Sequence, residues 1–320
     1  MYFKKLLHPE YFQGDKKRNN YFEGWYYKLV SADENSTIAL IPGVSINKDD
    51  KHAFIQVFVS KKNQDNVDLK TYYLRFSFDE FKYNHDIFSV SVGNNTFSLT
   101  HVSLNIKTDD LLLSGMITLT NLIPIKKTIL QPNIMGIFGY LNFMECYHGV
   151  ISMSHELHGK ITLNEEIIDF NDAQGYIEKD WGKSFPKAYV WLQSNHFKDT
   201  RTSLMFSYAE IPFLGLSFKG LIANLYYQNK EYRFATYNGA RVIKEIIQER
   251  SVTYILKKGR FYLEIMASSD YQTNLASPRN GKMIEQIKEG LSGNIKIRLL
   301  TKSSIIYEDT GYHAGIEIMK

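Results

Sequence analysis

The sequence of 320 residues has almost no cysteine and no concentrated charge of either sign. Its single cysteine, Cys146, excludes an intramolecular disulfide and a cysteine-based zinc knuckle. No block of lysine and arginine is longer than residues 16–18, and the net charge is only +4. A nucleic-acid surface needs concentrated positive charge, so we expect no nucleic-acid partner.

The sequence also lacks the apolar segments that direct a chain into or across a membrane. Its first residues have no apolar core of a signal peptide, and no run of about 18 apolar residues offers a transmembrane helix. The nearest approach, residues 129–144, is interrupted by Gln131, Pro132 and Asn133. We expect a cytoplasmic protein without a transmembrane segment, for which peripheral contact with a membrane stays open.

Sequence motifs for common cofactors and for serine hydrolases are missing. There is no glycine-rich dinucleotide fingerprint, no P-loop and no G-x-S-x-G motif. His155 and His158 lack the H-E-x-x-H spacing, and on a strand they would point to opposite faces. We therefore expect neither a cofactor nor a metal site.

What the chain has in excess is aromatic residues, which make up 14% and include 22 Tyr and 20 Phe. Strands accommodate these residues readily, so the excess indicates a β-rich fold or, alternatively, a ligand cavity lined by rings. Runs rich in Tyr, Phe, Val, Ile and Thr alternate with turn residues. They predict strands over residues 25–30, 37–41, 53–60, 72–78, 88–92, 96–100 and 115–120.

Three other segments have a predicted structure. Residues 92–96, V-G-N-N-T, predict a tight hairpin turn because Gly and Asn tolerate positive φ. Residues 280–290 predict a helix, since Met283, Ile284 and Ile287 would share one face. Residues 1–20 are polar, and we expect them to lie over the fold.

The two halves of the chain resemble each other. When Trp25 is aligned with Trp191, similar residues follow in the same order in both halves. Ile177-Glu178 also ends the first half much as Ile316-Glu317 ends the second. The comparison predicts a tandem β-repeat.

The repeat places an N-terminal domain at residues 1–183 and a C-terminal domain at residues 184–320. The first domain carries an extra segment near residues 123–160 that finds no counterpart in the second. Such an insertion could form a lid or site wall, or it could plug one end of a barrel.

Four sequence blocks and a weaker fifth are distinctive. They are Y-F-E-G-W-Y-Y-K (21–28), M-E-C-Y-H-G-V-I-S-M-S-H (144–155), G-Y-I-E-K-D-W-G-K-S-F-P (175–186), W-L-Q-S-N-H-F (191–197) and L-A-S-P-R-N-G-K-M (275–283). Together they resemble the tocopherol cyclase-like family. The resemblance implies an all-β fold of two tandem lipocalin-like antiparallel barrels, related to the carotenoid hydratase and Diels–Alderase-like superfamily. It also implies a hydrophobic, often isoprenoid, substrate held in a barrel or between the domains.

The family's reaction protonates a prenyl double bond, after which a phenol oxygen attacks the tertiary carbocation. Such chemistry needs a carboxyl group that keeps its proton in apolar surroundings. The candidates are Glu178, Asp180 and Glu23, all among aromatic residues. Glu178 and Asp180 would share one face of a strand, with Lys179 on the other. Alternatively, these carboxylates pair with neighbouring lysines and only hold the domains together.

The strand W-L-Q-S-N-H-F offers polar groups for a ligand. Alternation places Trp191, Gln193, Asn195 and Phe197 on one face, opposite Leu192, Ser194 and His196. Buried amides require partners, so Gln193 and Asn195 either bind the polar head of a ligand or form an internal network. The other predicted binding residues are Trp25, Tyr26, Lys28, Glu145, His148, Trp181, Trp191 and His196; His148 could also relay a proton.

The sequence thus predicts a cofactor-free protein of two β-barrels that binds a small hydrophobic or amphiphilic molecule. As an enzyme it would be an acid-promoted cyclase or hydratase. The alternative is a non-catalytic binding or carrier protein of the lipocalin type.

Overall fold

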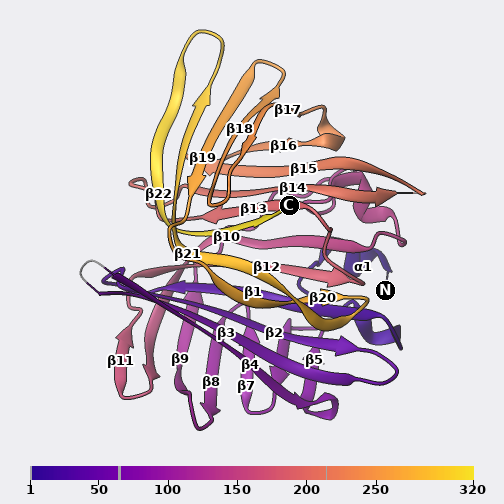
Figure 1. Ribbon diagram of the computed structural model, residues 1–320, viewed down its shortest axis with the longest axis vertical. Coiled ribbons are helices and arrows are strands. Elements are labelled where there is room, and N and C mark those ends of the chain that lie inside the picture. The colour runs from indigo at the N-terminus through magenta and orange to yellow at the C-terminus, as the bar shows by residue number, and fades with distance from the viewer. Residues whose placement is uncertain (1, 64–65, 214) are drawn as a thin grey trace. The chain divides into compact units, whose positions relative to one another are not determined.

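The computed structural model describes residues 2–63, 66–213 and 215–320 (Figure 1). The fold is all-β, as predicted, and helices are short and few in the described residues. They are α1 (Tyr2–Leu7) and the 3-10 turns η1 (Gly14–Lys16), η2 (Phe78–Glu80), η3 (Gly136–Tyr140) and η4 (Thr236–Asn238). None of the described helices is long and apolar enough to cross a membrane.

The first sheet has twelve strands in the order β4-β3-β2-β1-β12-β10-β9-β8-β7-β6-β5, with β11 paired to β10. The strands are β1 (Tyr21–Val30), β2 (Ser36–Ile46), β3 (Lys51–Asn63), β4 (Asn66–Ser77), β5 (Phe81–Asn84), β6 (Ser89–Val92), β7 (Asn95–Ser98), β8 (His101–Lys107), β9 (Leu112–Thr120), β10 (Cys146–Leu163), β11 (Glu166–Asp169) and β12 (Ala173–Gly182). The central strand β1 pairs antiparallel with both β2 and β12.

The second sheet has ten strands in the order β16-β15-β14-β13-β22-β21-β19-β18-β17, with β20 paired to β21. The strands are β13 (Tyr189–Ser194), β14 (Ser203–Phe213), β15 (Leu216–Tyr227), β16 (Lys230–Ala235), β17 (Arg241–Ile247), β18 (Ser251–Lys258), β19 (Phe261–Ser268), β20 (Thr273–Arg279), β21 (Lys282–Leu300) and β22 (Ile305–Met319).

The strand order of the two sheets follows one scheme. In each half the first strand pairs with the last, β1 with β12 and β13 with β22, and the last then pairs with β10 or β21. The strand β10 therefore has a counterpart in β21, and the part of the predicted insertion without a strand is residues 123–145. Among the described residues the pairing ends at β4 and β5 in the first sheet and at β16 and β17 in the second. In the part of the chain that the structure describes, each sheet curves around its core and no strand pairing joins its two edge strands.

Alternate residues of the central strands fill two separate cores. Trp25 and Tyr27 of β1 lie in the first core, and Val190 and Leu192 of β13 lie in the second. Tyr26 and Lys28 of β1 and Trp191 of β13 lie on the opposite face of each sheet and are buried as well. Because burial of a charge is costly without a partner, polar groups on these outer faces need a structural or a functional explanation.

The chain forms two compact units that are not continuous in sequence. The first contains the residues up to 134 together with 145–185 and 276–286, and the second contains 135–144, 186–275 and 287–320. The predicted domain boundary between residues 183 and 184 stays a prediction.

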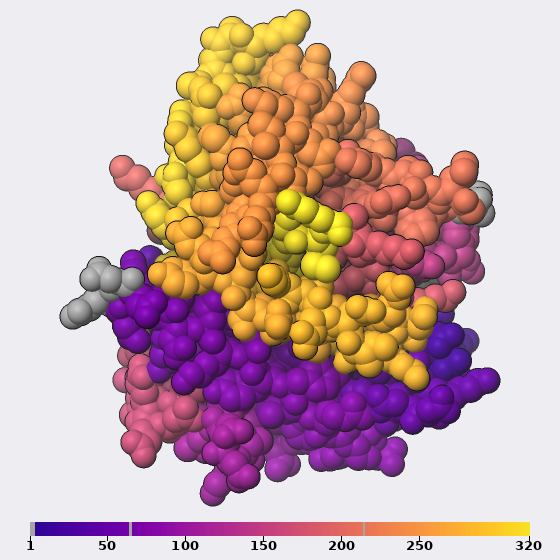
Figure 2. Space-filling view, viewed as in Figure 1, coloured from indigo at the N-terminus to yellow at the C-terminus, as the bar shows by residue number. Residues whose placement is uncertain are grey.

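The tip of the β20–β21 hairpin belongs to the first unit. The Ser45 hydroxyl donates a hydrogen bond to the carbonyl of Gly281 (2.8 Å), and the Gln56 amide exchanges two hydrogen bonds of 3.0 Å with the backbone of Ala276. Figure 1 shows this hairpin beside β1, and Figure 2 shows its gold atoms against the violet strands of the first unit. A segment from late in the sequence thereby completes the first unit.

The predicted helix over residues 280–290 is wrong, because this segment contains a hairpin turn followed by β21. Asn280 and Gly281 have φ values of 49° and 77°, the two positive angles that a two-residue hairpin turn requires. On the strand Ile284 is exposed and Ile287 is buried, whereas a helix would have placed them on one face. The seven predicted strands and the turn at residues 92–96 are confirmed.

The N-terminal segment does not simply lie over the fold. Tyr11 and Phe12 are buried in the first core, and the Trp25 indole donates a hydrogen bond of 2.7 Å to the carbonyl of Glu10.

The structure also corrects the predicted alignment of Trp25 with Trp191. Tyr27 pairs with Ile177, and Leu192 pairs with Ile316, so Trp191 corresponds to the residue after Trp25 and lies on the outer face.

Candidate functional site

Four polar side chains form a continuous chain on the outer face of the first sheet. The strand β12 supplies Tyr176, Glu178 and Asp180 at alternate positions, and β10 supplies His148 directly opposite Asp180. His148 Nδ1 lies 2.9 Å from Asp180 Oδ1, and its Nε2 lies 3.4 Å from Glu178 Oε2. The Tyr176 hydroxyl donates a hydrogen bond of 2.6 Å to Glu178 Oε2. We call this set the carboxylate–histidine chain.

The carboxylate–histidine chain runs from a partly exposed end to a buried one. The Asp180 side chain is 26% exposed, while Glu178 is 4% exposed and Tyr176 is fully buried. The predicted sharing of a face by Glu178 and Asp180 is confirmed, and Lys179 points the other way. His148 therefore connects the partly exposed carboxylate of Asp180 with the buried carboxylate of Glu178.

Electrostatics decide which members of the chain carry protons. Burial alone would lower the pKa of His148, but Asp180 and Glu178 outweigh it and raise this pKa to about 10. His148 is therefore an imidazolium at neutral pH. Burial, together with the charge of Glu178, raises the pKa of Tyr176 well above its usual value, so Tyr176 remains a neutral donor.

His148, Glu178 and Asp180 also offer possible metal-ligand atoms within 4.8 Å of one another. The two carboxylates, however, contact opposite nitrogens of the imidazole, and a metal ion would bind at only one of them. An imidazole with one carboxylate at each nitrogen is better suited to carry a proton on both nitrogens than to bind a metal ion. The expected absence of a metal and of a cofactor stays a prediction.

The third predicted acid, Glu23, lies on the core side of β1 in a closed network. Its carboxylate forms a fully buried ion pair with Lys179 and accepts hydrogen bonds from the Tyr21 hydroxyl and from the backbone amides of Gln13 and Gly14. All of these contacts come from groups of the protein itself, so the network holds the carboxylate in place. We assign Glu23 a structural role.

Lys179 is the other half of this network. Its ammonium donates hydrogen bonds to the carbonyls of Pro9 (2.8 Å) and Tyr11 (2.6 Å) and lies 4.7 Å and 4.8 Å from the ring centres of Trp25 and Trp181. Burial lowers the pKa of Lys179 to about 8, although Glu23 acts in the opposite direction. The pair fastens the N-terminal segment to β1 and β12.

Other predicted binding residues of the first unit are dispersed. Trp25 is part of the core, whereas Tyr26 and Lys28 are buried on the outer face. Trp181 stacks on Tyr147 with ring centres 5.4 Å apart. The fifth of these residues, Glu145, is exposed. Of this group, only Tyr26 and Lys28 share the outer face with Glu178.

The predicted binding residues of β13 lie in the second unit. Trp191 and Gln193 are buried on the outer face of the second sheet. The Gln193 amide contacts Asn195 Oδ1 at 3.4 Å, and His196 Nδ1 lies 3.2 Å from the same oxygen, so these three groups form part of an internal network. The predicted alternation fails at Phe197, which joins the second core because β13 has already ended at Ser194.

Sequence reasoning missed two residues. Tyr176 could have been found by its spacing, since it precedes Glu178 by two residues on the same strand. The second is Asn224 of β15, which is fully buried, and neither polar atom of its side chain has a hydrogen-bond partner in the described structure. It pairs with Arg233 across the sheet. The burial of Asn224 and its position opposite Arg233 become visible only in the structure.

The comparisons with known proteins agree with this architecture. Among solved structures, the chain is similar to CghA with Sch210972 (8% identity, TM-score 0.59, covering 93% of this chain and 88% of that chain). It is also similar to a candidate AttH protein of Nitrosomonas europaea (16%, 0.53, 93% of both) and to kievitone hydratase from Nectria haematococca (13%, 0.52, 95% and 91%). At such identities the likeness shows the fold alone. The model of the tocopherol cyclase-like family matches residues 126–319, more than half of the chain. The chain therefore belongs to the tocopherol cyclase-like family.

Proposed function

We propose that the protein is an enzyme that uses the carboxylate–histidine chain to protonate a hydrophobic, isoprenoid-type substrate and so promote its cyclisation or hydration. The observation that carries the proposal is the series of contacts Asp180–His148–Glu178–Tyr176, which leads from a partly exposed carboxylate to a buried one; its link from His148 Nε2 to Glu178 is an ion pair of 3.4 Å. Membership of the tocopherol cyclase-like family supports the class of reaction.

The proposed proton path follows from the order of the groups. His148, an imidazolium with a proton on each nitrogen, passes its Nε2 proton to Glu178 and keeps its Nδ1 proton, which faces Asp180. The resulting carboxylic acid of Glu178 is the donor to the substrate double bond. After a phenol or water oxygen has attacked the carbocation, the carboxylate recovers the released proton.

Each neighbour has a defined part in this scheme. The Tyr176 hydroxyl holds one oxygen of Glu178, so the carboxyl group keeps one orientation. The raised pKa of His148 keeps the relay protonated at neutral pH. Burial keeps bulk solvent away from the Glu178 carboxyl group.

The test uses a prenylated hydroquinone and the purified full chain in D₂O, followed by mass spectrometry. Protonation of the double bond by the enzyme places one deuterium on carbon, and this label survives return to H₂O. A cyclised product otherwise keeps the mass of the substrate, whereas hydration adds one water. A molecule that binds and is recovered unchanged and unlabelled would support the alternative of a non-catalytic carrier.

Variants then assign the reaction to the site. We expect Glu178→Gln to lower kcat by about 100-fold or more, because loss of a positioned general acid typically costs about 10²–10⁴-fold. Asp180→Asn should lower kcat less, since solvent can still reach His148. Glu156→Gln, at an exposed carboxylate on β10, is the matched control and should keep full turnover. Full turnover in Glu178→Gln would refute the proposed role.

A further inference from the structure

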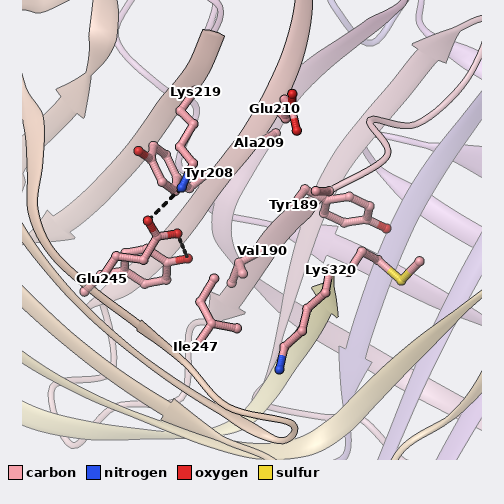
Figure 3. Close-up of a pocket in the computed structure, with 12 residues that line it drawn as sticks. Tyr189, Val190, Tyr208, Ala209, Glu210, Lys219, Glu245, Ile247 and Lys320 are labelled. Atoms are coloured by element: carbon pink, nitrogen blue, oxygen red, sulfur yellow. Dashed lines mark hydrogen bonds and ion pairs between the residues drawn. The ribbon is translucent and has the colours of Figure 1, made fainter. Parts of the chain in front are cut away.

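The second unit contains a pocket that the chemistry proposed above does not use. It has a volume of about 320 Å³ and lies among the ends of β13, β14, β15, β17 and β22, together with β18. Figure 3 shows Lys219, Glu245 and Tyr208 along one side of the pocket and Val190 and Ile247 next to Glu245. This volume lies at the lower end of the range for small-ligand sites.

One wall of the pocket is a polar network with balanced charge. Lys219 Nζ donates a hydrogen bond of 2.8 Å to Glu245 Oε2, and the Tyr254 hydroxyl donates one of 3.3 Å to Glu245 Oε1 (Figure 3). The Lys219 ammonium also lies 5.3 Å from the ring centre of Tyr208. An ammonium has three donors, and Glu245 engages one of them. The network can therefore both donate to a ligand and accept from it.

Most of the other lining residues are apolar. Val190 and Tyr254 belong to the second core, and Ile247 packs against it. Ala209 and Met319 add to this apolar lining, while Glu210 and Lys320 add one further charge of each sign, so the charges remain balanced. An apolar body placed against these side chains would leave water, which favours binding by about 25 cal/mol per Å² of buried area.

The charge balance decides the class of the ligand head. A carboxylate head would meet Glu245, and an ammonium head would meet Lys219, so each would gain one contact and suffer one repulsion. A hydroxyl avoids both repulsions, because it can donate to Glu245 and accept from Lys219. We propose that this pocket binds a small uncharged amphiphile through a hydroxyl head, with its apolar body against Val190 and Ile247.

The experiment compares three eight-carbon probes that carry different head groups. We would titrate the full chain with 1-octanol, octanoate and octylamine by calorimetry at neutral pH. The proposal expects 1-octanol to bind more tightly than either charged probe by about fivefold or more. No binding of 1-octanol, or equal affinity for the three probes, would overturn it.

Two single substitutions locate the binding and test the charge argument. Glu245→Gln removes the repulsion of octanoate, so the ratio of octanoate to octanol affinity should rise about fivefold. Lys219→Met should raise the ratio for octylamine in the same way. Glu308→Gln is the matched control, because Glu308 pairs with Lys296 at 2.9 Å and does not line the pocket. Ratios in both pocket variants that equal those of the control would place the ligand elsewhere and overturn the proposal.

Discussion

The ion pair between Lys179 and Glu23 offers the sharpest test of what holds the first unit together. Lys179→Met keeps the length and the apolar stem of the side chain and removes only the ammonium. That ammonium contacts the Glu23 carboxylate and two carbonyls of the N-terminal segment, all within the protein interior. The substitution therefore leaves a carboxylate buried without its counter-charge.

The expected magnitude follows from these contacts. Removing one partner of a buried ion pair typically costs about 3–5 kcal/mol, and the remaining hydrogen bonds to Glu23 offset part of this cost. We expect Lys179→Met to lower the free energy of unfolding of the first unit by about 4 kcal/mol. The double variant with Glu23→Gln should cost less than the sum of the single variants, by about 2 kcal/mol, because both act on one network.

Urea unfolding followed by tryptophan fluorescence is the suitable assay. Trp25 and Trp181 both lie within 5 Å of the Lys179 ammonium, so their emission reports on the first unit. Trp191 belongs to the second unit and can be replaced by Phe in all samples. The control is Lys160→Met, which breaks an exposed pair of 3.4 Å with Asp169 and should cost less than about 1 kcal/mol. A Lys179→Met cost as small as that of the control would refute the reasoning.

Three further predictions concern other features. Because the pKa of His148 is raised from 6.5 to about 10, its stabilisation is complete below pH 6.5 and disappears as the pH rises through 10. The difference in unfolding free energy between the wild type and His148→Gln should shrink by roughly 5 kcal/mol across that window, and a constant difference would contradict this. Gly281→Ala should destabilise the first unit by about 2 kcal/mol or more in the same assay, since φ is 77° and a Cβ would lie 2.1 Å from the backbone nitrogen of Tyr21; a loss of a few tenths would argue against the close contact. Asn224→Ala should cost under about 1 kcal/mol in thermal unfolding, because loss of packing is offset by removal of an unsatisfied buried amide; a loss of 3 kcal/mol would show that the amide is satisfied.

The sequence predicts those parts of the fold that depend on local patterns. Alternating aromatic and β-branched runs marked the strands, and the glycine and asparagines at residues 93–95 marked a turn. The β20–β21 hairpin was missed because Met283, Ile284 and Ile287 also fit a helical period, although Asn280-Gly281 is itself a hairpin signal.

The sequence predicted only the part of the site that lies on a single strand. The spacing of Glu178 and Asp180 places both on one face without reference to any other strand. Their contact with His148 spans 32 residues and depends on the register of β10 against β12, which no local pattern sets. Likewise, the ion pair of Glu23 with Lys179 depends on the pairing of β1 with β12.

A comparison of the two sheets separates what the repeat requires from what is particular to the proposed site. The register makes Glu317 the counterpart of Glu178, and each accepts a hydrogen bond of 2.6 Å from a tyrosine hydroxyl. Because that tyrosine comes from β12 in one sheet and from β13 in the other, the common need is a donor for a buried carboxylate. Two residues beyond the glutamate, the first sheet has Asp180 and the second has Met319. On the neighbouring strand, Val150 lies opposite Glu178 and His148 opposite Asp180 in the first sheet, whereas Glu289 lies opposite Glu317 in the second. An imidazolium that contacts two carboxylates can give a proton to one of them. In the second sheet, Glu289, Glu317 and Met319 occupy the corresponding place without an imidazole. The chemistry proposed for the first unit therefore depends on His148 and Asp180, the residues that the repeat does not share.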